Sequence, residues 1–232
     1  MNVPPVDHWS SPGRYLTWIA LLPVLSLAIL GVWSALHFGD LPARITVHWN
    51  LNGPDGWVRT SPRTIAAFVG GFAAICLVLA ALAWVLCVPR LVVSGGTGED
   101  ERQFRRRTAG LLLICAYFIA CVPWFSLLEA PAAVLRIWGL CLVIAIIGGV
   151  IGLMVAAQRA QRSFRAAQAS QPQTQRERWK WGVFYFDRTD PAVLVPKRFG
   201  VGYTFNFGNG WAWVLLAAIL VLPGALFLLL MR

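Results

Sequence analysis

The stretch IAAFVGGFAAICLVLAALAWVLCV, which runs from Ile65 to Val88, decides the fold class. It is 24 residues long and contains no Asp, Glu, Lys, Arg or His side chain. About 20 apolar residues in helical conformation cross a hydrocarbon core of roughly 30 Å. A helix also satisfies its own backbone hydrogen bonds, which is a requirement in lipid. The stretch therefore predicts a transmembrane helix.

Four further apolar runs have a similar length. They are Tyr15–Leu36, Ala109–Leu128, Val134–Ala157 and Trp211–Met231. Arg136, near the start of one run, can extend its guanidinium to the membrane surface. The composition agrees, because 58% of the residues are hydrophobic and 13% are charged, whereas about a quarter are charged in a soluble domain. The predicted fold class is an α-helical integral membrane protein with five transmembrane helices.

The distribution of Lys and Arg predicts the orientation. Basic residues resist translocation, so they accumulate in cytoplasmic loops. With the amino terminus in the cytoplasm, 15 of the 20 Lys and Arg residues lie inside and five lie outside. The carboxyl terminus is then expected outside. The formal net charge of +10 lies beside apolar runs, which indicates phospholipid headgroups as a partner and makes nucleic acid an unlikely one.

These predictions divide the chain into consecutive segments. The predicted segments are a cytoplasmic amino terminus (1–14), a two-helix unit (15–88) with an outer loop (37–64), a basic cytoplasmic loop (89–108), a helical hairpin (109–157), a cytoplasmic helix extension with a β-rich segment (158–210) and a final transmembrane helix (211–232).

The outer loop contains a strand pattern followed by a turn pattern. In Arg44–Asn50, apolar and polar side chains alternate, which is typical of a half-buried strand. Asn52–Gly56 is dense in turn-forming residues, and Trp57–Arg59 returns along the first strand. We expect a small extracytoplasmic β-hairpin whose apolar face rests on the helix ends.

Two residues of this loop, His48 and Asp55, have side chains suited to metal binding or acid–base chemistry. Two groups fall short of the three protein ligands that a catalytic zinc needs. In the alternative interpretation, His48 and Asn50 hydrogen-bond backbone groups of the loop and Asp55 caps the turn. Trp49 and Trp57 then serve as aromatic anchors for a ligand. The predicted recognition residues are His48, Trp49, Asn50, Gly53, Asp55 and Trp57, with no catalytic residue, metal ligand or cofactor.

The second aqueous segment is predicted to lie in the cytoplasm. Residues 159–175 favour helix, with a short linker at 170–175, and the aromatic stretches that follow favour β-strands. A unit of this size buries too little core to be stable alone, so it must rest on the membrane face or on a partner. Its phenylalanines alternate at strand spacing and are expected to form one packed or membrane-facing side. They are Phe184, Phe186, Phe205 and Phe207.

Two stretches resemble uncharacterised families. Leu41–Asn50, followed by Gly53, Asp55 and Gly56, resembles the signature of a bacterial (SdpI-like) family of integral membrane proteins that includes the immunity protein of the sporulation-delaying toxin system. Trp179–Phe207 resembles a second small domain that often accompanies the first. The resemblance implies a bacterial inner membrane, protection against a toxic peptide and sequestration of a cytoplasmic repressor. The chain departs from the immunity protein by lacking its further helices. The resemblance implies no catalytic residues for this chain.

The leading hypothesis is a non-enzymatic protein of envelope sensing, signalling or peptide-toxin immunity. Its expected partners are a secreted peptide outside, a regulator protein inside and a second copy of the chain. The predicted cytoplasmic docking residues are Tyr185, Asp190, Pro191, Lys197, Arg198, Tyr203 and Asn206. One alternative is a membrane-interface enzyme or metal-binding protein that uses His48 and Asp55. Another is a transporter subunit, against which the lack of polar residues in the middle of the helices argues.

Overall fold

A computed structural model describes residues 14–50, 53–88, 99–169, 177–198 and 202–231. Several predicted segments therefore lie wholly or partly outside the described residues. They are the amino terminus up to residue 13, the first half of the basic loop, the linker at 170–175 and the start of the predicted turn at Asn52.

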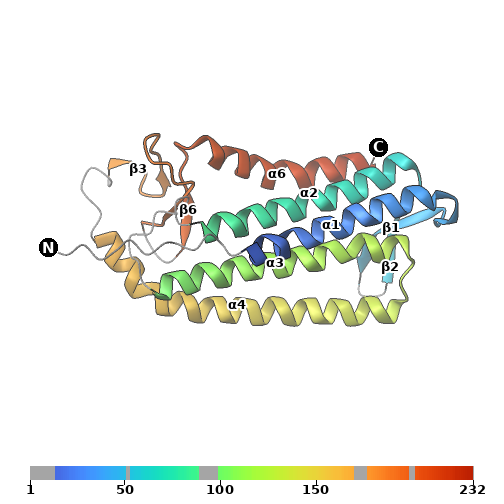
Figure 1. Ribbon diagram of the computed structural model, residues 1–232, viewed down its shortest axis with the longest axis horizontal. Helices are drawn as coiled ribbons and strands as arrows, with labels where there is room; N and C mark the ends of the chain where they lie inside the picture. Colours follow the sequence, from blue (N-terminus) through green and yellow to red (C-terminus); the bar gives the residue numbers. More distant parts are fainter. Residues whose placement is uncertain (1–13, 51–52, 89–98, 170–176, 199–201, 232) are drawn as a thin grey trace.

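Five long helices lie side by side along the long axis of the molecule (Figure 1). They are α1 (Arg14–Leu36), α2 (Pro62–Cys87), α3 (Glu99–Leu127), α4 (Ala132–Ala169) and α6 (Gly210–Met231). The first four contain apolar stretches long enough to cross a membrane, and α6 contains a shorter apolar stretch, Gly210–Leu222. The fold is that of an α-helical membrane protein with small β-hairpins, as the sequence predicted.

Helices α3 and α4 extend beyond the predicted apolar runs. α3 begins at Glu99, although its apolar run begins only at Ala109. The residues between them are mostly Glu, Gln and Arg, which favour helix, so the helix continues past the end of its apolar part. α4 likewise continues without a break to Ala169.

The helix core has its main contacts around α2, which packs against α1, α3 and α6, while α4 packs against α3. Leu27 of α1, Phe68 of α2 and Ala116 of α3 belong to one buried cluster. α4 approaches α3 closely at Gly149, where an added Cβ would lie 2.4 Å from Leu111 Cδ1. Much of the remaining α4 surface consists of exposed large apolar side chains, which suits a lipid environment.

The β-strands form two groups at opposite ends of the bundle (Figure 1). At one end, β1 (Arg44–Asn50) and β2 (Gly53–Arg59) form an antiparallel hairpin between α1 and α2, preceded by a short 3-10 helix, η1 (Phe38–Asp40). The group at the other end precedes α6 and is called here the β3–β6 unit, residues 177–209. Its strands are β3 (Trp179–Lys180), β4 (Phe184–Tyr185), β5 (Leu194–Pro196) and β6 (Tyr203–Phe205). β3 pairs with β4, β5 pairs with β6, and a bridge from Tyr185 to Asn206 connects the pairs.

Candidate functional site

The register of the β1–β2 hairpin is irregular at His48. Thr46 pairs with Trp57 and His48 pairs with Gly56, and the register shifts on both sides of His48. Such bulges re-aim side chains on the bulged strand. The structure also corrects the predicted turn at Asn52–Gly56, because β2 already begins at Gly53. Gly53 has a φ of 127°, which only glycine adopts readily.

Three polar side chains of the hairpin form one cluster, called here the Asp55 cluster: His48, Asn50 and Asp55. The Nδ1–H of His48 donates to Oδ1 of Asp55, and Nδ2 of Asn50 donates to Oδ2 of Asp55 at 2.8 Å. His48 and Asn50 thus both donate to this carboxylate, a contact that the sequence pattern did not indicate. The hydrogen bond from His48, helped by that from Asn50, lowers the pKa of Asp55 below its ordinary value. Asp55 is therefore a fixed, ionised acceptor on the surface.

The base of the hairpin is fixed in the helix bundle. Ile45 of β1 is fully buried in the same cluster as Leu27 and Phe68. The backbone N–H of Thr60 donates to Ala43 O at 3.0 Å, which closes the hairpin where α2 begins. This attachment holds the exposed part of the hairpin in a defined position relative to α1, α2 and α3.

The predicted recognition residues are mostly accessible. His48, Asn50, Asp55 and Trp57 are exposed, while Trp49 and Gly53 are half-buried. Trp57 is 54% exposed, and large aromatic side chains on the surface are typical binding anchors. Recognition by these residues stays a prediction.

The contact between His48 and Asp55 also bears on proton transfer and metal binding. A carboxylate on Nδ1 fixes the tautomer and the orientation of an imidazole, as it does in many general bases and metal sites. Among the residues that the structure describes, no three His, Cys, Asp or Glu side chains gather as a metal site would require.

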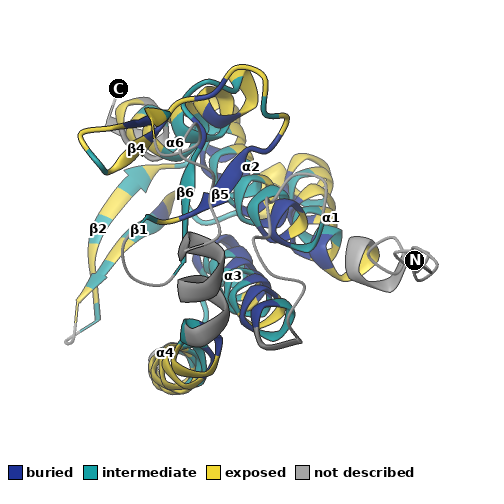
Figure 2. Cartoon of the chain, turned by 90° about the vertical axis from the view of Figure 1, so that its left-hand side faces the viewer, coloured by how far each residue is buried: buried dark blue, intermediate teal, exposed yellow. Residues whose placement is uncertain are grey.

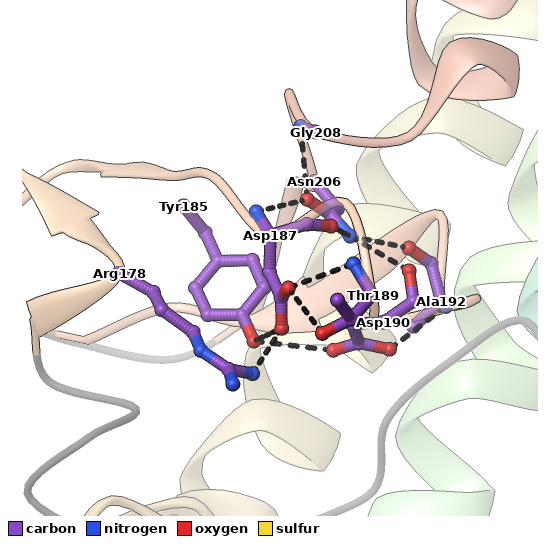
Figure 3. Close-up of polar contacts among 8 residues, drawn as sticks. All are labelled: Arg178, Tyr185, Asp187, Thr189, Asp190, Ala192, Asn206 and Gly208. Atoms are coloured by element: carbon purple, nitrogen blue, oxygen red, sulfur yellow. Dashed lines mark hydrogen bonds and ion pairs between the residues drawn. The ribbon is translucent and has the colours of Figure 1, made fainter.

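The β3–β6 unit is organised around Asn206, whose side chain is fully buried (Figure 3). Its Nδ2 donates to three backbone carbonyls, those of Asp187 at 2.9 Å, Asp190 at 3.1 Å and Ala192 at 3.0 Å. Its Oδ1 accepts from the backbone N–H groups of Asp187 and Gly208, each at 3.0 Å. One side-chain amide therefore links separate loops in addition to the strand pairing.

Asp187 is the second centre of this network. Its side chain is buried and forms an ion pair with Arg178, and it accepts hydrogen bonds from the backbone N–H and the hydroxyl of Thr189 at 2.9 and 2.7 Å. Burial raises the pKa of Asp187, but the hydrogen bonds from Thr189 and the charge of Arg178 outweigh burial, so the pKa lies below its ordinary value. Tyr185 completes the network by donating to the Asp190 carboxylate at 3.2 Å.

A long-range hydrogen bond and apolar packing attach the described part of the unit to the helix bundle. The hydroxyl of Tyr203 donates to Glu101 Oε1 of α3 at 2.6 Å, and Val193 and Leu194 pack in a cluster with Ala83 and Leu86. Burial and the neighbouring Glu101 raise the pKa of Tyr203, so the hydroxyl keeps its proton and remains a donor. Glu101 was missed at the sequence level, although it is an acidic residue directly before a run of arginines.

The predicted docking residues have different environments in the unit. Tyr185 and Asn206 are buried, and Tyr203 is engaged by α3, so these three make contacts within the chain. The others lie at least partly on the surface of the unit: Asp190, Pro191, Lys197 and Arg198. Docking of a regulator stays a prediction, and these four residues are where a partner would meet the unit.

The comparison with known families finds a match within this unit and the start of α6. Residues 188–213 match a family of unknown function, DUF5808. No curated protein and no solved structure matches the chain. The matched stretch continues into α6 as far as Trp213. Of the residues drawn in Figure 3 it contains Thr189, Asp190, Ala192, Asn206 and Gly208. Over this short stretch the chain is similar to a family of unknown function, and the match does not show a second domain spanning Trp179–Phe207. No match supports the resemblance of the β1–β2 region to the immunity-protein family.

Proposed function

We propose that the protein spans the bacterial cytoplasmic membrane five times, with its amino terminus inside and its carboxyl terminus outside. The 22 residues of α6 extend over roughly 33 Å at 1.5 Å per residue, which is sufficient for a crossing. The excess of basic residues in alternate loops supports the β3–β6 unit as the cytoplasmic end. A reporter enzyme that is active only outside the cytoplasm, fused after Arg232, is then expected to be active. An inactive fusion that is present at normal abundance would contradict this orientation.

The β1–β2 hairpin is proposed to recognise a secreted peptide, in envelope sensing, signalling or peptide-toxin immunity. The observation that carries this proposal is the exposed Trp57 on the same small hairpin as the ionised Asp55, with the hairpin base buried at Ile45. An aromatic anchor supplies contact area, and a fixed carboxylate supplies one directed acceptor for an amine or amide of the peptide. Because the hairpin is held in place before binding, little ordering free energy is lost on association.

Helix α3 offers a physical connection between the two ends. Its outer part packs against β1, and its first described turns carry Glu101, which holds Tyr203 of the β3–β6 unit. Suppose that a peptide binds the hairpin more tightly when α3 is in one of two positions. Binding would then shift the population of molecules toward that position, and the β3–β6 unit would present a changed surface to a regulator. This is a hypothesis about coupling. It predicts that Tyr203→Phe leaves peptide capture intact while it changes the regulator response.

Capture from the hairpin tests the recognition proposal directly. A photo-crosslinking amino acid replaces Trp57 in intact cells, and the captured molecules are identified by mass spectrometry. The matched control carries it at Trp211, which is also an exposed tryptophan but lies in the first turn of α6. α6 begins at the opposite end of the bundle from the β1–β2 hairpin (Figure 1). We expect a secreted peptide at position 57 only, and a weaker yield when Asp55→Asn is added. Capture of lipid alone at both positions would contradict peptide recognition.

A second candidate function is acid–base or metal chemistry at the hairpin, which the contact between His48 and Asp55 favours. Since Nδ1 is engaged by the carboxylate, Nε2 would be the nitrogen that takes a proton or a metal ion. This candidate predicts that the purified protein binds zinc stoichiometrically and that His48→Ala abolishes the binding. Zinc uptake that is unchanged in His48→Ala would eliminate the hairpin as the metal site.

A further inference from the structure

Four aromatic rings form a continuous surface at the edge of the β3–β6 unit. We call them the aromatic ledge: Trp181, Phe184, Phe207 and Trp213. Neighbouring rings meet at angles near the edge-to-face arrangement, with centroid distances of 6.1 Å from Trp181 to Phe184, 5.3 Å from Phe184 to Phe207 and 5.4 Å from Phe207 to Trp213. This is the favoured geometry for aromatic pairs, so the rings are held as one surface.

Trp181 is in an unusual position at the tip of the β3–β4 hairpin. Its side chain is 90% exposed. Its φ is 52° and that of Gly182 is 73°, and Val183 N–H donates to Lys180 O at 3.2 Å, as in a type I′ turn. Asn, Asp and Gly are the residues that favour this turn, whereas a bulky residue with a positive φ is strained. A tryptophan here is unfavourable both for the backbone and for solvation in water, which points to a function.

The ledge is joined to the first turn of α6. The indole Nε1 of Trp213 donates to Phe207 O at 2.9 Å, and Asn209 Oδ1 accepts from Trp211 N–H at the helix start. Trp211 and Trp213 are both exposed at the beginning of an apolar helix. The ledge therefore lies at the level where α6 would enter the membrane, which is the preferred depth of tryptophan side chains.

The strand that carries Phe184, β4, lies at the periphery of the bundle in the view along its axis (Figure 2). β4 lies beside α6, at the outside of the helix bundle, whereas β5 and β6 lie over its centre (Figure 2). A groove of about 540 Å³ runs along the ledge, and its charged lining residues are Glu177 and Lys180. The two charges are opposite, so the groove has no net attraction for ions of one sign.

We propose that the aromatic ledge is a lipid-contact surface, with Trp181 inserted at the boundary between headgroups and acyl chains of the leaflet at which α6 begins. The occupant of the groove is a phospholipid of that leaflet. This inference depends on a membrane crossing by α6 and is independent of peptide recognition at the β1–β2 hairpin. Because Lys180 and Glu177 offset each other, aromatic and apolar contacts supply the attraction, and lipid contact changes little with salt.

The first test locates lipid by crosslinking. The full-length protein is reconstituted in vesicles of equal parts phosphatidylethanolamine and phosphatidylglycerol, with a photo-crosslinking amino acid at position 181. The control carries it at Lys197, which is exposed and follows β5. We expect lipid adducts at position 181 to exceed those at 197 several-fold, at low and at high salt. Equal adducts at the two positions, or adducts at 181 only to a second protein chain, would overturn the proposal.

The second test separates lipid contact from folding of the turn. Asn is favoured where the backbone has a positive φ, so Trp181→Asn relieves the turn while it removes the indole. Hydrogen exchange of the peptide covering residues 179–186 is compared in vesicles and in detergent. We expect the wild-type protein to be several-fold better protected in vesicles, and Trp181→Asn to lose this difference while Trp181→Phe keeps most of it. An undiminished difference in Trp181→Asn would refute lipid contact through Trp181.

Discussion

Replacing Asn206 by Asp tests the central claim about the β3–β6 unit. The substitution is almost isosteric, but it exchanges the Nδ2 donor for a second acceptor oxygen. In the structure that nitrogen donates to three backbone carbonyls inside a fully buried site. The new oxygen would face those carbonyls. The hydrogen-bond partners of the Asn206 side chain among the described residues are backbone groups, so none of them would neutralise a charged carboxylate. The side chain would be forced either to take up a proton or to open the loops.

The magnitude follows from the hydrogen-bond inventory. An amide nitrogen has two hydrogens, and each buried hydrogen bond contributes about 1 kcal/mol net. The acceptors left without a donor, together with the repulsion between oxygens, add about 1–3 kcal/mol. The expected loss is therefore about 4 kcal/mol in the free energy of opening of the unit. That is a large fraction of the 5–15 kcal/mol typical of a whole domain.

Hydrogen exchange measured by mass spectrometry on the full-length protein in detergent provides the assay. A loss of about 4 kcal/mol corresponds to roughly thousandfold faster exchange in the peptides covering residues 185–196 and 203–209. Asn209→Asp is the matched control, because it keeps the Oδ1 that accepts from Trp211 N–H. It loses an exposed hydrogen bond from Nδ2 to Pro191 O at 2.9 Å and a long one to Ala192 O at 3.4 Å. We expect less than about tenfold change in the control. Wild-type exchange in Asn206→Asp would refute the central role of this amide.

Three further outcomes follow from contacts of single residues. Gly208→Ala should open the same unit, because the added Cβ would lie 2.4 Å from the carbonyl carbon of Asp187. Limited proteolysis within 185–209 should then become faster. An unchanged cleavage pattern would speak against that close approach. Ile45→Ala should lower the free energy of unfolding by about 2–4 kcal/mol, because it leaves a cavity at the hairpin base. A thermal unfolding curve would show this as a lower midpoint. An unaltered midpoint would argue against burial of Ile45 in the bundle. The pKa of Asp55 is lowered in the folded hairpin, so its contribution to stability is present above the ordinary aspartate value and is lost as the pH falls through the lowered value. Carboxyl carbon NMR should therefore find its titration midpoint below that of an ordinary aspartate, and His48→Ala should raise it; a midpoint that does not respond to this substitution would exclude the hydrogen bond as the cause.

The elements that could be predicted from the sequence depend on local patterns. The helices are visible as apolar runs, because crossing a membrane requires a minimum length of apolar residues whatever the neighbours are. The β1–β2 hairpin is visible in the alternation of Arg44–Asn50, since one face of a strand must be apolar to rest on the helices. The limits of α3 were harder to predict, because Glu and Arg continue a helix as readily as they form a loop.

The candidate sites were only partly predictable. His48, Asn50 and Asp55 were selected by residue type, but their mutual contact results from register shifts in β1 that alternation does not reveal. The burial of Asn206 was not apparent either, because an asparagine between two phenylalanines of a predicted strand is expected on the face opposite their packed side. Only the folded loops place three carbonyls around its amide.

The sequence by itself determined that this chain is a helical membrane protein with patterned segments between its helices, since apolar length and strand alternation act over a few turns of chain. The tertiary structure alone decided which side chains meet. Tyr203 and Glu101 are 102 positions apart in sequence and still share a hydrogen bond, and Trp181 meets Trp213 only through two intervening phenylalanine rings. Such contacts arise from the packing of α3, α6 and the β3–β6 unit at one end of the bundle, and a local pattern of residues contains no information about that packing.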